Sequence, residues 1–491
     1  MRTVPGRTDK IVVVGAGLGG LAAALHLAGA GREVTVLERA DEPGGRAGVL
    51  RDGGYTFDTG PTVLTMPSLI ADTLAAVDEN LDDWLDLRRL DPAYRARFAD
   101  GSALDVHADV DAMTLAIRDL CGLRDADGYR RLVAYLQTLY EIELPHFIGR
   151  NLDSPVSLLG RPLLRLIALG GFRRLGPRVA SFVDDERLRR LFTFQAMYAG
   201  LAPAQALAIY GVITYLDSVA GVYYPIGGIH AVPRALAGAA VKHGVDIRYG
   251  TAAARIDVRN GRATGVITDA SDRIPADVVV VNADAPTAYR ELLNRKPPAL
   301  RYSPSCVVMY AGVRNGPADA HHTISFGAAW QATFDEIIKQ GRVMSDPSFL
   351  LTTPTVTDPS LAPDGAHSHY VLFPAPNLDH PQPLDWAKRT PRYVEHLLAT
   401  LAARGFELDP EVHHVTTPAG WGGSAGTPFA ASHRFAQTGP FRMPTLDRRI
   451  ENLVFCGANV QPGVGVPMVL VSGRLAAERV VGPGVLSATM A

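Results

Sequence analysis

The sequence predicts an α/β fold in which a parallel sheet is assembled from distant parts of the chain. Three observations predict it. A β-branched run at 11–14 breaks at a glycine and leads into an alanine-rich helix. A buried run of four valines at 278–281 is typical of a parallel strand, and the strand expected at 453–456 is followed by a glycine-rich turn and a helix. With 491 residues, 47% of them hydrophobic, the chain is long enough for two or three packed units.

Charge and cysteine content exclude several kinds of partner. The 48 Lys and Arg residues nearly balance the 50 Asp and Glu residues, so no overall field attracts nucleic acid. The three cysteines are odd in number and far apart, which implies neither a disulfide framework nor a thiolate metal site and fits a reducing compartment. The adjacent histidines at 321–322 and 413–414 are expected to point apart in strands, so we expect no metal.

The uncharged stretch at 11–31 follows a basic N-terminus and has the hydropathy of a signal peptide or membrane span. Its glycine spacing argues against both. Gly15-x-Gly17-x-x-Gly20 comes directly after a strand and opens a helix, and the next strand ends in Glu38, which is the full context of a dinucleotide fingerprint. The glycines allow a tight turn, close approach to a pyrophosphate and close helix packing, while Glu38 suits a ribose hydroxyl. We therefore expect a Rossmann-like domain.

A second set of glycines favours FAD over NAD. Gly44-Gly45-Arg46 and the Asp-Thr-Gly-Pro run at 58–61 suit a cofactor that continues past its pyrophosphate toward a flavin. This stretch resembles the corresponding part of the flavin amine oxidase and carotenoid desaturase superfamily.

The turn GANVQPGVGVPMVL at 457–470 is expected to hold the flavin ring. A helix begins near Val466, and its N-terminus carries roughly half a positive charge, which stabilises the negative charge of a reduced flavin. Glycines allow close approach to the ring, and the lack of charged side chains suits an apolar substrate.

Six segments carry a resemblance that covers nearly the whole chain. They are GVYYPIGGIHAVPRALAGAAVKHGVDIRYGTAAARI at 221–256, DVVVVNADAPTAYRELL at 277–293, YSPSCVVMYAGVR at 302–314, HHTISFG at 321–327, TDPSLAPDG at 357–365 and NLVFCGANVQPGVGVPMVLVSGRLAAE at 452–478. Together they resemble the bacterial phytoene desaturases of carotenoid synthesis. The resemblance implies an FAD enzyme that introduces double bonds into phytoene, a membrane-dissolved C40 polyene, toward lycopene, with oxygen or a quinone as electron acceptor.

The resemblance also implies which residues contact FAD. At the phosphate end they are Gly15, Gly17, Gly20, Glu38, Arg39, Gly44, Gly45 and Arg46, with Ala253 touching the adenine through its backbone. Near the flavin they are Gly457, Ala458, Gly465, Val466, Pro467 and Met468. The family's C-terminal turn often reads Thr-His-Pro-Gly, whereas positions 460–463 read Val-Gln-Pro-Gly here, so no role for that histidine is carried over.

The expected domain organisation follows from these motifs. The FAD-binding domain is expected to comprise 1–90, 225–295 and 415–491, and a mixed α+β substrate-binding domain 91–154 and 296–414. The segment 155–224 is expected to be helical and membrane-facing. Within it, 155–183 has no acidic residue but five arginines among clustered aliphatics, a pattern that favours an interfacial helix over the alternative of a core helix with solvated arginines. Because phytoene is too apolar to diffuse through water, we expect a peripheral protein on the cytoplasmic side of the cell membrane.

No acid or base is assigned from the sequence. Flavin N5 accepts the hydride of a desaturation, and the proton has several routes away, including the flavin itself and water. Polar candidates near recognisable motifs are Asp58, Glu141, Glu143, Asp217 and His230, each of which also reads as solvated or structural.

Alternative functions stay open. They are a carotenoid isomerase or later-pathway carotenoid desaturase of the same family, a non-catalytic carotenoid or lipid binder that keeps FAD for structure, and a soluble amine oxidase.

Overall fold

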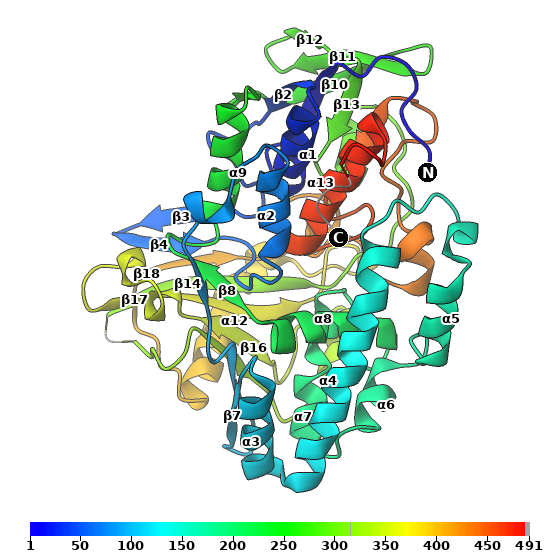
Figure 1. Ribbon diagram of the computed structural model, residues 1–491. Helices are drawn as coiled ribbons and strands as arrows, with labels where there is room; N and C mark the ends of the chain where they lie inside the picture. Colours follow the sequence, from blue (N-terminus) through cyan, green and yellow to red (C-terminus); the bar gives the residue numbers. More distant parts are fainter. Residues whose placement is uncertain (315, 487–491) are drawn as a thin grey trace.

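The computed structural model describes residues 1–314 and 316–486 and contains two main sheets with a layer of helices beside them (Figure 1). The first sheet has five strands, and every pair within it is parallel. Its order is β19 (Leu453–Phe455), β13 (Val278–Val281), β1 (Lys10–Val14), β2 (Glu33–Leu37) and β9 (Asp246–Arg248). Strands from the beginning, the middle and the end of the chain therefore lie side by side.

Both faces of the parallel sheet are covered, which is why its central strands are almost wholly apolar. One face packs against helices and the other against a small antiparallel sheet. The helices are α1 (Leu18–Gly29), α2 (Ser68–Ala75), α9 (Ala231–Lys242) and α13 (Val466–Val481), and the small sheet contains β10 (Ala253–Arg259), β11 (Arg262–Thr268) and β12 (Arg273–Pro275).

The second sheet has seven strands and is antiparallel except where β6 meets β15. Its order is β18 (Pro410–Thr416), β14 (Ser305–Arg314), β17 (Ala366–Ala375), β16 (Phe349–Thr352), β15 (His322–Ser325), β6 (Tyr94–Arg97) and β7 (Ala103–Val106). Helix α12 (Trp386–Ala403) covers one face, where Trp386, Tyr393 and Leu397 pack on alternate strand residues such as Met309 and Val371. The opposite face packs against Tyr55 and Phe57 of the strand at 55–58.

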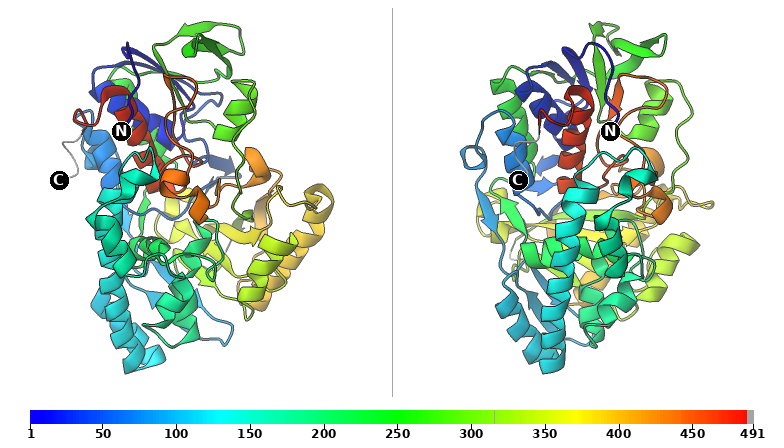
Figure 2. Two further views of the ribbon diagram at one scale, coloured as in Figure 1. Left: turned by 90° about the vertical axis from the view of Figure 1, so that its right-hand side faces the viewer. Right: turned by 45° about the vertical axis from the view of Figure 1, so that its right-hand side comes forward.

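The helical layer lies beside the seven-stranded sheet (Figure 2). It contains α3 (Val110–Cys121), α4 (Leu123–Glu143), α5 (Arg161–Ala168), α6 (Leu175–Ala180), α7 (Glu186–Leu191) and α8 (Gly211–Tyr215). Two wide, π-helical turns extend α4 and α8, namely η2 (Leu144–Ile148) and η6 (Leu216–Ala220). None of the helices within the described residues is long and apolar enough to cross a membrane.

Short elements join these layers. Two further antiparallel sheets have two strands each: β3 (Val49–Asp52) and β4 (Tyr55–Asp58) form a hairpin, whereas β5 (Leu87–Arg89) pairs with the distant β8 (Tyr223–Pro225). The remaining α-helices are α10 (Ala285–Glu291) and α11 (Gln331–Asp335). The expected fold class is confirmed, because a parallel sheet from discontinuous segments is accompanied by a mixed α+β part and a helical part. That the helical part faces a membrane stays a prediction. The expected domain boundaries stay a prediction.

Candidate functional site

The turn between β1 and α1 has the form that its glycines predict. Gly15 has a φ of +103°, in the left-handed region that favours glycine. A Cβ atom on Gly20 would lie 2.1 Å from the carbonyl oxygen of Gly15, so helix and strand approach each other too closely for any side chain. Helix α1 begins after Gly17 with no side-chain cap and no acidic residue in its first turn. Its N-terminal N–H groups are therefore suited to an anion such as a pyrophosphate.

Glu38 and the second glycine pair border this turn. The buried carboxylate of Glu38 accepts hydrogen bonds from the backbone N–H of Ala16 at 2.7 Å and of Ala40 at 2.9 Å. The N–H of Gly44 donates to Ala16 at 2.9 Å, and a Cβ on Gly45 would lie 3.4 Å from the Cα of Gly17. The motifs at 15–20, 38 and 44–45 thus lie together in one cradle.

The C-terminal turn closes the same cradle from the other side. Helix α13 begins after Gly465, again with no side-chain cap and no acid in its first turn. A Cβ on Gly473 of α13 would lie 2.4 Å from the carbonyl oxygen of Gly19, and a Cβ on Gly19 would lie 3.4 Å from the Cα of Gly457. The helices that follow the first and the last strand of the parallel sheet therefore pack backbone against backbone, so the two ends of the chain share one site.

The other residues expected at this site lie around it. Val466, Pro467 and Met468 form the first turn of α13, and the backbone oxygen of Ala458 accepts a 2.6 Å hydrogen bond from buried Arg442. Arg46 donates to the carbonyl oxygen of Pro428 at 3.3 Å, and burial lowers the pKa of its guanidinium. Arg39 is exposed at the end of β2, and Ala253 begins β10. Contact of each of these residues with a cofactor stays a prediction.

Asn282 is a central residue of the cradle that no sequence motif indicated. Its side chain would meet a Cβ placed on Gly17 at 2.7 Å or on Gly457 at 3.1 Å, and it donates to the carbonyl oxygen of Gly15 at 3.4 Å. The signal that points to it is topological. Asn282 follows β13, and the carboxyl end of that strand lies between those of β1 and β19, which is where ligands bind in open parallel sheets.

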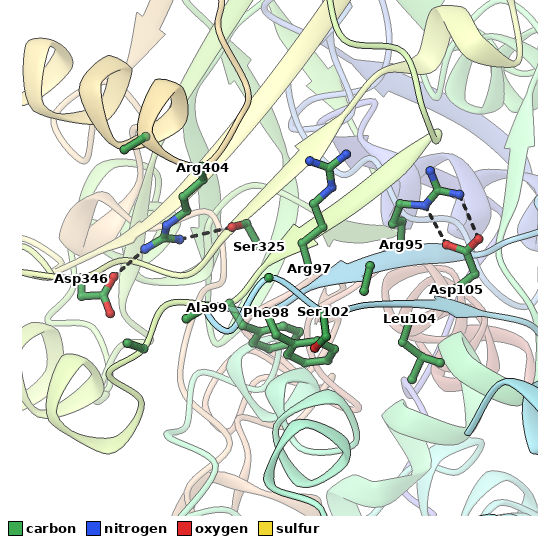
Figure 3. A pocket seen from close by; sticks show the side chains of 15 residues that line it. Arg95, Arg97, Phe98, Ala99, Ser102, Leu104, Asp105, Ser325, Asp346 and Arg404 are labelled. Carbon is green, nitrogen blue, oxygen red and sulfur yellow. Dashed lines mark hydrogen bonds and ion pairs between the residues drawn. The ribbon is translucent and has the colours of Figure 1, made fainter. Parts of the chain in front are cut away.

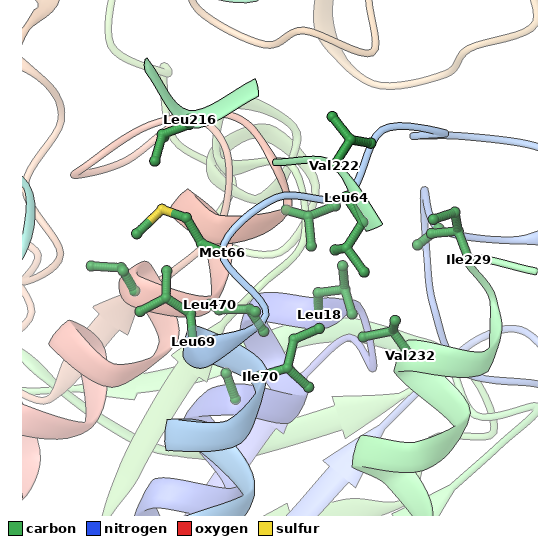
Figure 4. Packing of buried hydrophobic residues seen from close by; sticks show 14 of the residues in the cluster. Leu18, Leu64, Met66, Leu69, Ile70, Leu216, Val222, Ile229, Val232 and Leu470 are labelled. Atoms are coloured by element: carbon green, nitrogen blue, oxygen red, sulfur yellow. The ribbon is translucent and has the colours of Figure 1, made fainter. Parts of the chain in front are cut away.

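An apolar wall stands beside the cradle (Figure 4). Leu18 is the first residue of α1 and Leu470 the fifth of α13, and they pack with Leu64, Met66 and Leu216 in one buried cluster. The cradle therefore has a polar, backbone-lined end at its glycines and an apolar border beyond them. This arrangement fits FAD, whose phosphates need N–H donors and whose ring needs a dry surface.

Gln461 stands where the resembled family often has a histidine, and it is a structural clamp. Its side-chain amide donates to the carbonyl oxygens of Leu152 and Gly439, and its amide oxygen accepts from the N–H of Leu152 at 3.1 Å. The hydroxyl of Ser472 on α13 donates to its backbone oxygen at 2.7 Å. Gln461 therefore ties the C-terminal turn to the helical layer and has no side-chain group left for chemistry.

The polar candidates divide into separate environments. Asp58 accepts from the hydroxyl of Tyr224 at 3.0 Å and from the N–H of His230 at 3.2 Å, and burial raises its pKa to about 6. Glu143 is buried with one carboxyl oxygen unpartnered, and desolvation raises its pKa well above the usual range. Glu141 is exposed and accepts from Gln137. Asp217 is buried in η6, distant in the chain from Asp58, Glu141 and Glu143.

The expectation that His321 and His322 point apart is wrong. Their ring centroids lie 4.5 Å apart because His321 precedes β15 and escapes the alternation of the strand. Each Nδ1 has a threonine partner, and both rings are kept neutral by burial, which lowers their pKa values.

A separate pocket lies at the edge of the seven-stranded sheet, near β6 and β7 (Figure 3). Its three arginines are each paired with an acid: Arg95 with Asp105, Arg97 with Asp319 and Arg404 with Asp346. Their charges are therefore neutralised, and none of the cradle residues lines this pocket.

Comparisons with known proteins agree with the geometry of the cradle. The family model described as flavin containing amine oxidoreductase matches residues 18–481. A phytoene dehydrogenase from Streptomyces griseus is 55% identical over 499 residues, covering 99% of this chain and 98% of that protein. A zeta-carotene-forming phytoene desaturase from Myxococcus xanthus is 40% identical, covering 96% of this chain and 93% of that protein. A solved oxidoreductase from Methanosarcina mazei has the same fold, with a TM-score of 0.65, 18% identity, and coverage of 95% of this chain and 99% of that one.

Proposed function

The chain belongs to the family of flavin-containing amine oxidoreductases, and on that premise we propose that it desaturates phytoene toward lycopene. It is an FAD-dependent oxidoreductase of carotenoid desaturation with a hydrophobic carotenoid substrate. The observation that carries the proposal is the packing of Gly19 against Val469 and Gly473 of α13, because it brings the uncapped N-terminus of α1 beside the first two turns of α13, whose N-terminus is also uncapped. The apolar wall beside the cradle supports a substrate without charge.

The residues of the chain bind and orient the cofactor and keep water away from the reaction. The N-termini of α1 and α13 favour negative charge at the two ends of the cofactor, and the glycines admit its backbone contacts. When bound, FAD supplies the hydride acceptor that the removal of hydrogen from a CH2–CH2 pair requires. Leu18, Met66 and Leu470 exclude water from the border of the cradle.

Flavin bleaching tests the proposal directly. Anaerobic addition of phytoene in liposomes to the purified holoprotein should bleach the visible flavin band, and chromatography should show carotenes with more double bonds. An unbleached flavin with bound substrate would support the non-catalytic binder instead. Bleaching by another carotene but not by phytoene would support the later-pathway desaturase. A cis–trans change of the substrate without bleaching would support the isomerase. Turnover of a small amine without lipid would support the amine oxidase.

A second experiment, expression in cells, gives the number of double bonds formed. The Myxococcus xanthus relative is named zeta-carotene-forming, whereas the product that we propose is lycopene. Each added double bond lengthens the chromophore, so expression in cells that accumulate phytoene should give a lycopene spectrum. A zeta-carotene spectrum would overturn this part of the proposal.

We also propose that the protein is peripheral on the cytoplasmic side of the cell membrane and passes electrons to oxygen or a quinone. Support comes from an exposed apolar patch formed by two distant segments. Its side chains are Val156, Leu159, Leu164, Ile167 and Phe172 together with Phe435 and Phe441. The rings of Phe172 and Phe435 lie 6.2 Å apart, which joins the segments into one surface, here called the apolar patch.

The charged side chains of residues 155–183, which form much of the apolar patch, are all arginines. Arg161, Arg165, Arg173 and Arg174 are exposed, and none forms an ion pair with an acid within the described residues. Arginines around exposed aliphatic side chains suit anionic headgroups above an acyl boundary. The C-terminal turn reaches this region through the bonds of Gln461 to Leu152 and Gly439, so the patch lies close to the cradle.

A further inference from the structure

The end of β13 lies between the two turns that form the cradle. In the parallel sheet β13 has β1 on one side and β19 on the other, and these two strands lead into the two turns. The backbone N–H of Asn282 donates to the carbonyl oxygen of Val14 at 2.9 Å, and the N–H of Cys456 donates to that of Val281 at 3.0 Å. The residue that follows β13 is therefore held directly between the starts of both turns.

The side chain of Asn282 links the two turns a second time. Its Nδ2 donates to the carbonyl oxygen of Gly15 at 3.4 Å, and its Oδ1 accepts from Sγ of Cys456 at 3.5 Å. Gly15 begins the fingerprint turn at 15–20, and Cys456 comes directly before the C-terminal turn. An amide suits this place because it carries a donor and an acceptor, one for the carbonyl oxygen and one for the thiol.

Glycines of both turns leave room for this amide. A Cβ on Gly17 would lie 2.7 Å from Nδ2 of Asn282, whereas the carbonyl oxygen of Gly44 would be 3.9 Å away. A Cβ on Gly19 would lie 2.8 Å from Oδ1 of the same amide, and a Cβ on Gly457 would lie 3.1 Å from it. The glycines therefore admit the side chain of Asn282 as well as a cofactor.

Asp284, two residues further along, also reaches the C-terminal turn. Its Oδ1 accepts from Nδ2 of Asn459 at 2.6 Å, but its Oδ2 accepts from the N–H of Thr287 at 3.2 Å and so caps α10. A change of Asp284 would therefore disturb a helix as well. Within the described residues, the side-chain hydrogen bonds of Asn282 join only the two turns, so its removal tests the link alone.

We propose that Asn282 is a positioning residue that couples the two ends of the FAD site. Its amide holds the fingerprint turn and the C-terminal turn at one separation, so a ligand that contacts both turns meets them already in place. A neutral side chain is needed here, because a carboxylate beside the N-terminus of α1 would repel the phosphates that this terminus favours. The inference rests on FAD as the cofactor and is independent of the substrate.

Two ligands separate coupling from general damage to the site. FAD spans both turns, whereas ADP has the adenosine and pyrophosphate of FAD and should engage the fingerprint turn alone. In full-length protein stripped of flavin, Asn282→Ala should lower the affinity for FAD on the order of tenfold, as expected for one or two lost hydrogen bonds, and that for ADP by less than about threefold. Quenching of flavin fluorescence measures the first affinity and titration calorimetry the second.

Asn282→Asp tests the place of the side chain through its charge. The new carboxylate has nearly the same shape but is negative, so it should lower the affinity for FAD and for ADP on the order of a hundredfold at low salt. FAD should lose more than ADP, because the donor to Gly15 is lost as well. Raising the salt to about 0.3 M should reduce both losses, since salt screens the repulsion. A purely structural disturbance would not respond to salt in this way.

Asn452→Ala is the matched control. Asn452 directly precedes β19 and is buried, and its Nδ2 donates to the carbonyl oxygens of Ala263 at 2.7 Å and Asp277 at 2.6 Å. Because Asp277 directly precedes β13, this amide ties together the beginnings of two strands whose ends Asn282 ties. Asn452→Ala should lower the free energy of unfolding and leave the ratio of FAD affinity to ADP affinity unchanged.

Several results would overturn the inference. One is an unchanged ratio of FAD affinity to ADP affinity in Asn282→Ala, and another is the same change of that ratio in Asn452→Ala. A loss in Asn282→Asp that salt does not reduce would place residue 282 away from the phosphates and would overturn it too. Should Asn282→Ala fail to fold, Asn282→Asp decides, because equal, salt-independent losses of FAD and ADP would contradict the coupling.

The titrations contain no carotenoid, so they separate this inference from the proposed function. If phytoene fails to bleach the unmodified protein but Asn282→Ala loses FAD selectively, the proposed reaction falls and the role of Asn282 stands. If phytoene bleaches the flavin and Asn282→Ala keeps the unmodified ratio of affinities, only the role of Asn282 falls.

Discussion

Gly473 lies where the two ends of the chain meet, and its lack of a side chain sets the distance between α1 and α13. A Cβ there would lie 2.4 Å from the carbonyl oxygen of Gly19 and 2.7 Å from the Cβ of Ala22. Both contacts are with rigid parts of α1, so the helices must separate to admit a methyl group. The cradle formed by their first turns would then widen.

We therefore expect Gly473→Ala to destabilise the protein by about 1–3 kcal/mol and to reduce its flavin content. Denaturant unfolding and the ratio of flavin to protein absorbance measure the two effects. Gly484→Ala is the control, because apart from its chain neighbours no atom lies within 4 Å of the added Cβ. That change should be neutral or stabilise by about 0.4–1 kcal/mol. Equal flavin content and stability in the two variants would contradict the close contact.

Asp58 should make the free energy of unfolding decrease as pH rises. Its pKa is raised from 3.8 to about 6 by burial, so the folded state binds a proton more tightly than the unfolded state. Between about pH 4 and pH 6 the contribution of Asp58 to stability therefore falls as pH rises, by on the order of 2–3 kcal/mol, and it stays constant above pH 6.

Asp58→Asn should remove the contribution of Asp58 to the change of unfolding free energy with pH. The free energy of unfolding of the unmodified protein minus that of the variant should decrease as pH rises from 4 to 6. Urea unfolding at several pH values measures this difference, which cancels the carboxyl groups that both proteins share. A difference that stays constant or rises between pH 4 and pH 6 would show that the pKa of Asp58 is not raised in the folded protein.

At the scale of elements, local signals predict some parts of the fold and not others. The strand, turn and helix at 10–29 follow from a β-branched run, spaced glycines and an alanine-rich run, and β1 and α1 lie there. Strand β14 is buried at every residue except its last, so no alternation tells which face meets α12. Its partners β17 and β18 follow much later in the chain, and only tertiary packing fixes their order.

The candidate site divides in the same way. Its glycines can be predicted because spacing alone carries the requirement for close backbone approach. Asn282 carries no such pattern, because the end of β13 sets its place in the cradle. Asp217 is among the polar candidates of the sequence, but no periodicity in the sequence indicates the π-helical turn in which it is buried. Residues whose roles depend on where a strand ends or a helix widens become visible only in the folded chain.

Helix α5 and the segment at 435–441 allow a test of membrane binding. Leu164 and Ile167 are 65% and 54% exposed on α5, within the apolar patch. The double change Leu164→Asp and Ile167→Asp should lower binding to anionic liposomes, because it removes apolar contact and adds negative charge near the headgroups. Sedimentation with liposomes should show about a tenfold or greater loss of affinity.

Leu123→Asp provides the control for that change. Leu123 is 70% exposed but lies at the start of α4, outside the apolar patch. It should leave liposome binding unchanged, and added salt should weaken binding of the unmodified protein because exposed arginines contribute to it. Equal loss in both variants, or no loss in either, would contradict a specific role for the apolar patch.

At the scale of the whole molecule, the parallel sheet depends on three distant segments, and so does the cradle. Strand β19 joins the sheet only beside β13, which in turn pairs with β1. The backbone N–H of Val4 also donates to the carbonyl oxygen of Arg479 at 2.7 Å, which ties the first residues to α13. A cofactor bound across this assembly contacts parts of the chain that separate only when the domain unfolds.

FAD should therefore stabilise the assembled chain as a unit. A ligand that binds only the folded state adds RT ln(1 + [L]/Kd), or about 2.7 kcal/mol at a hundredfold excess over Kd. Adding FAD to protein stripped of flavin should raise the unfolding midpoint, and the midpoint should keep rising with FAD concentration. The release of flavin and the loss of helical circular dichroism should then coincide in one transition. If flavin left well before the helices unfolded, the cradle would depend on a local loop and not on the meeting of the two chain ends.

A chain cut after Phe455 separates these cases further. It keeps the five strands and the fingerprint at 15–20 but lacks α13, so it should neither bind FAD nor be stabilised by it.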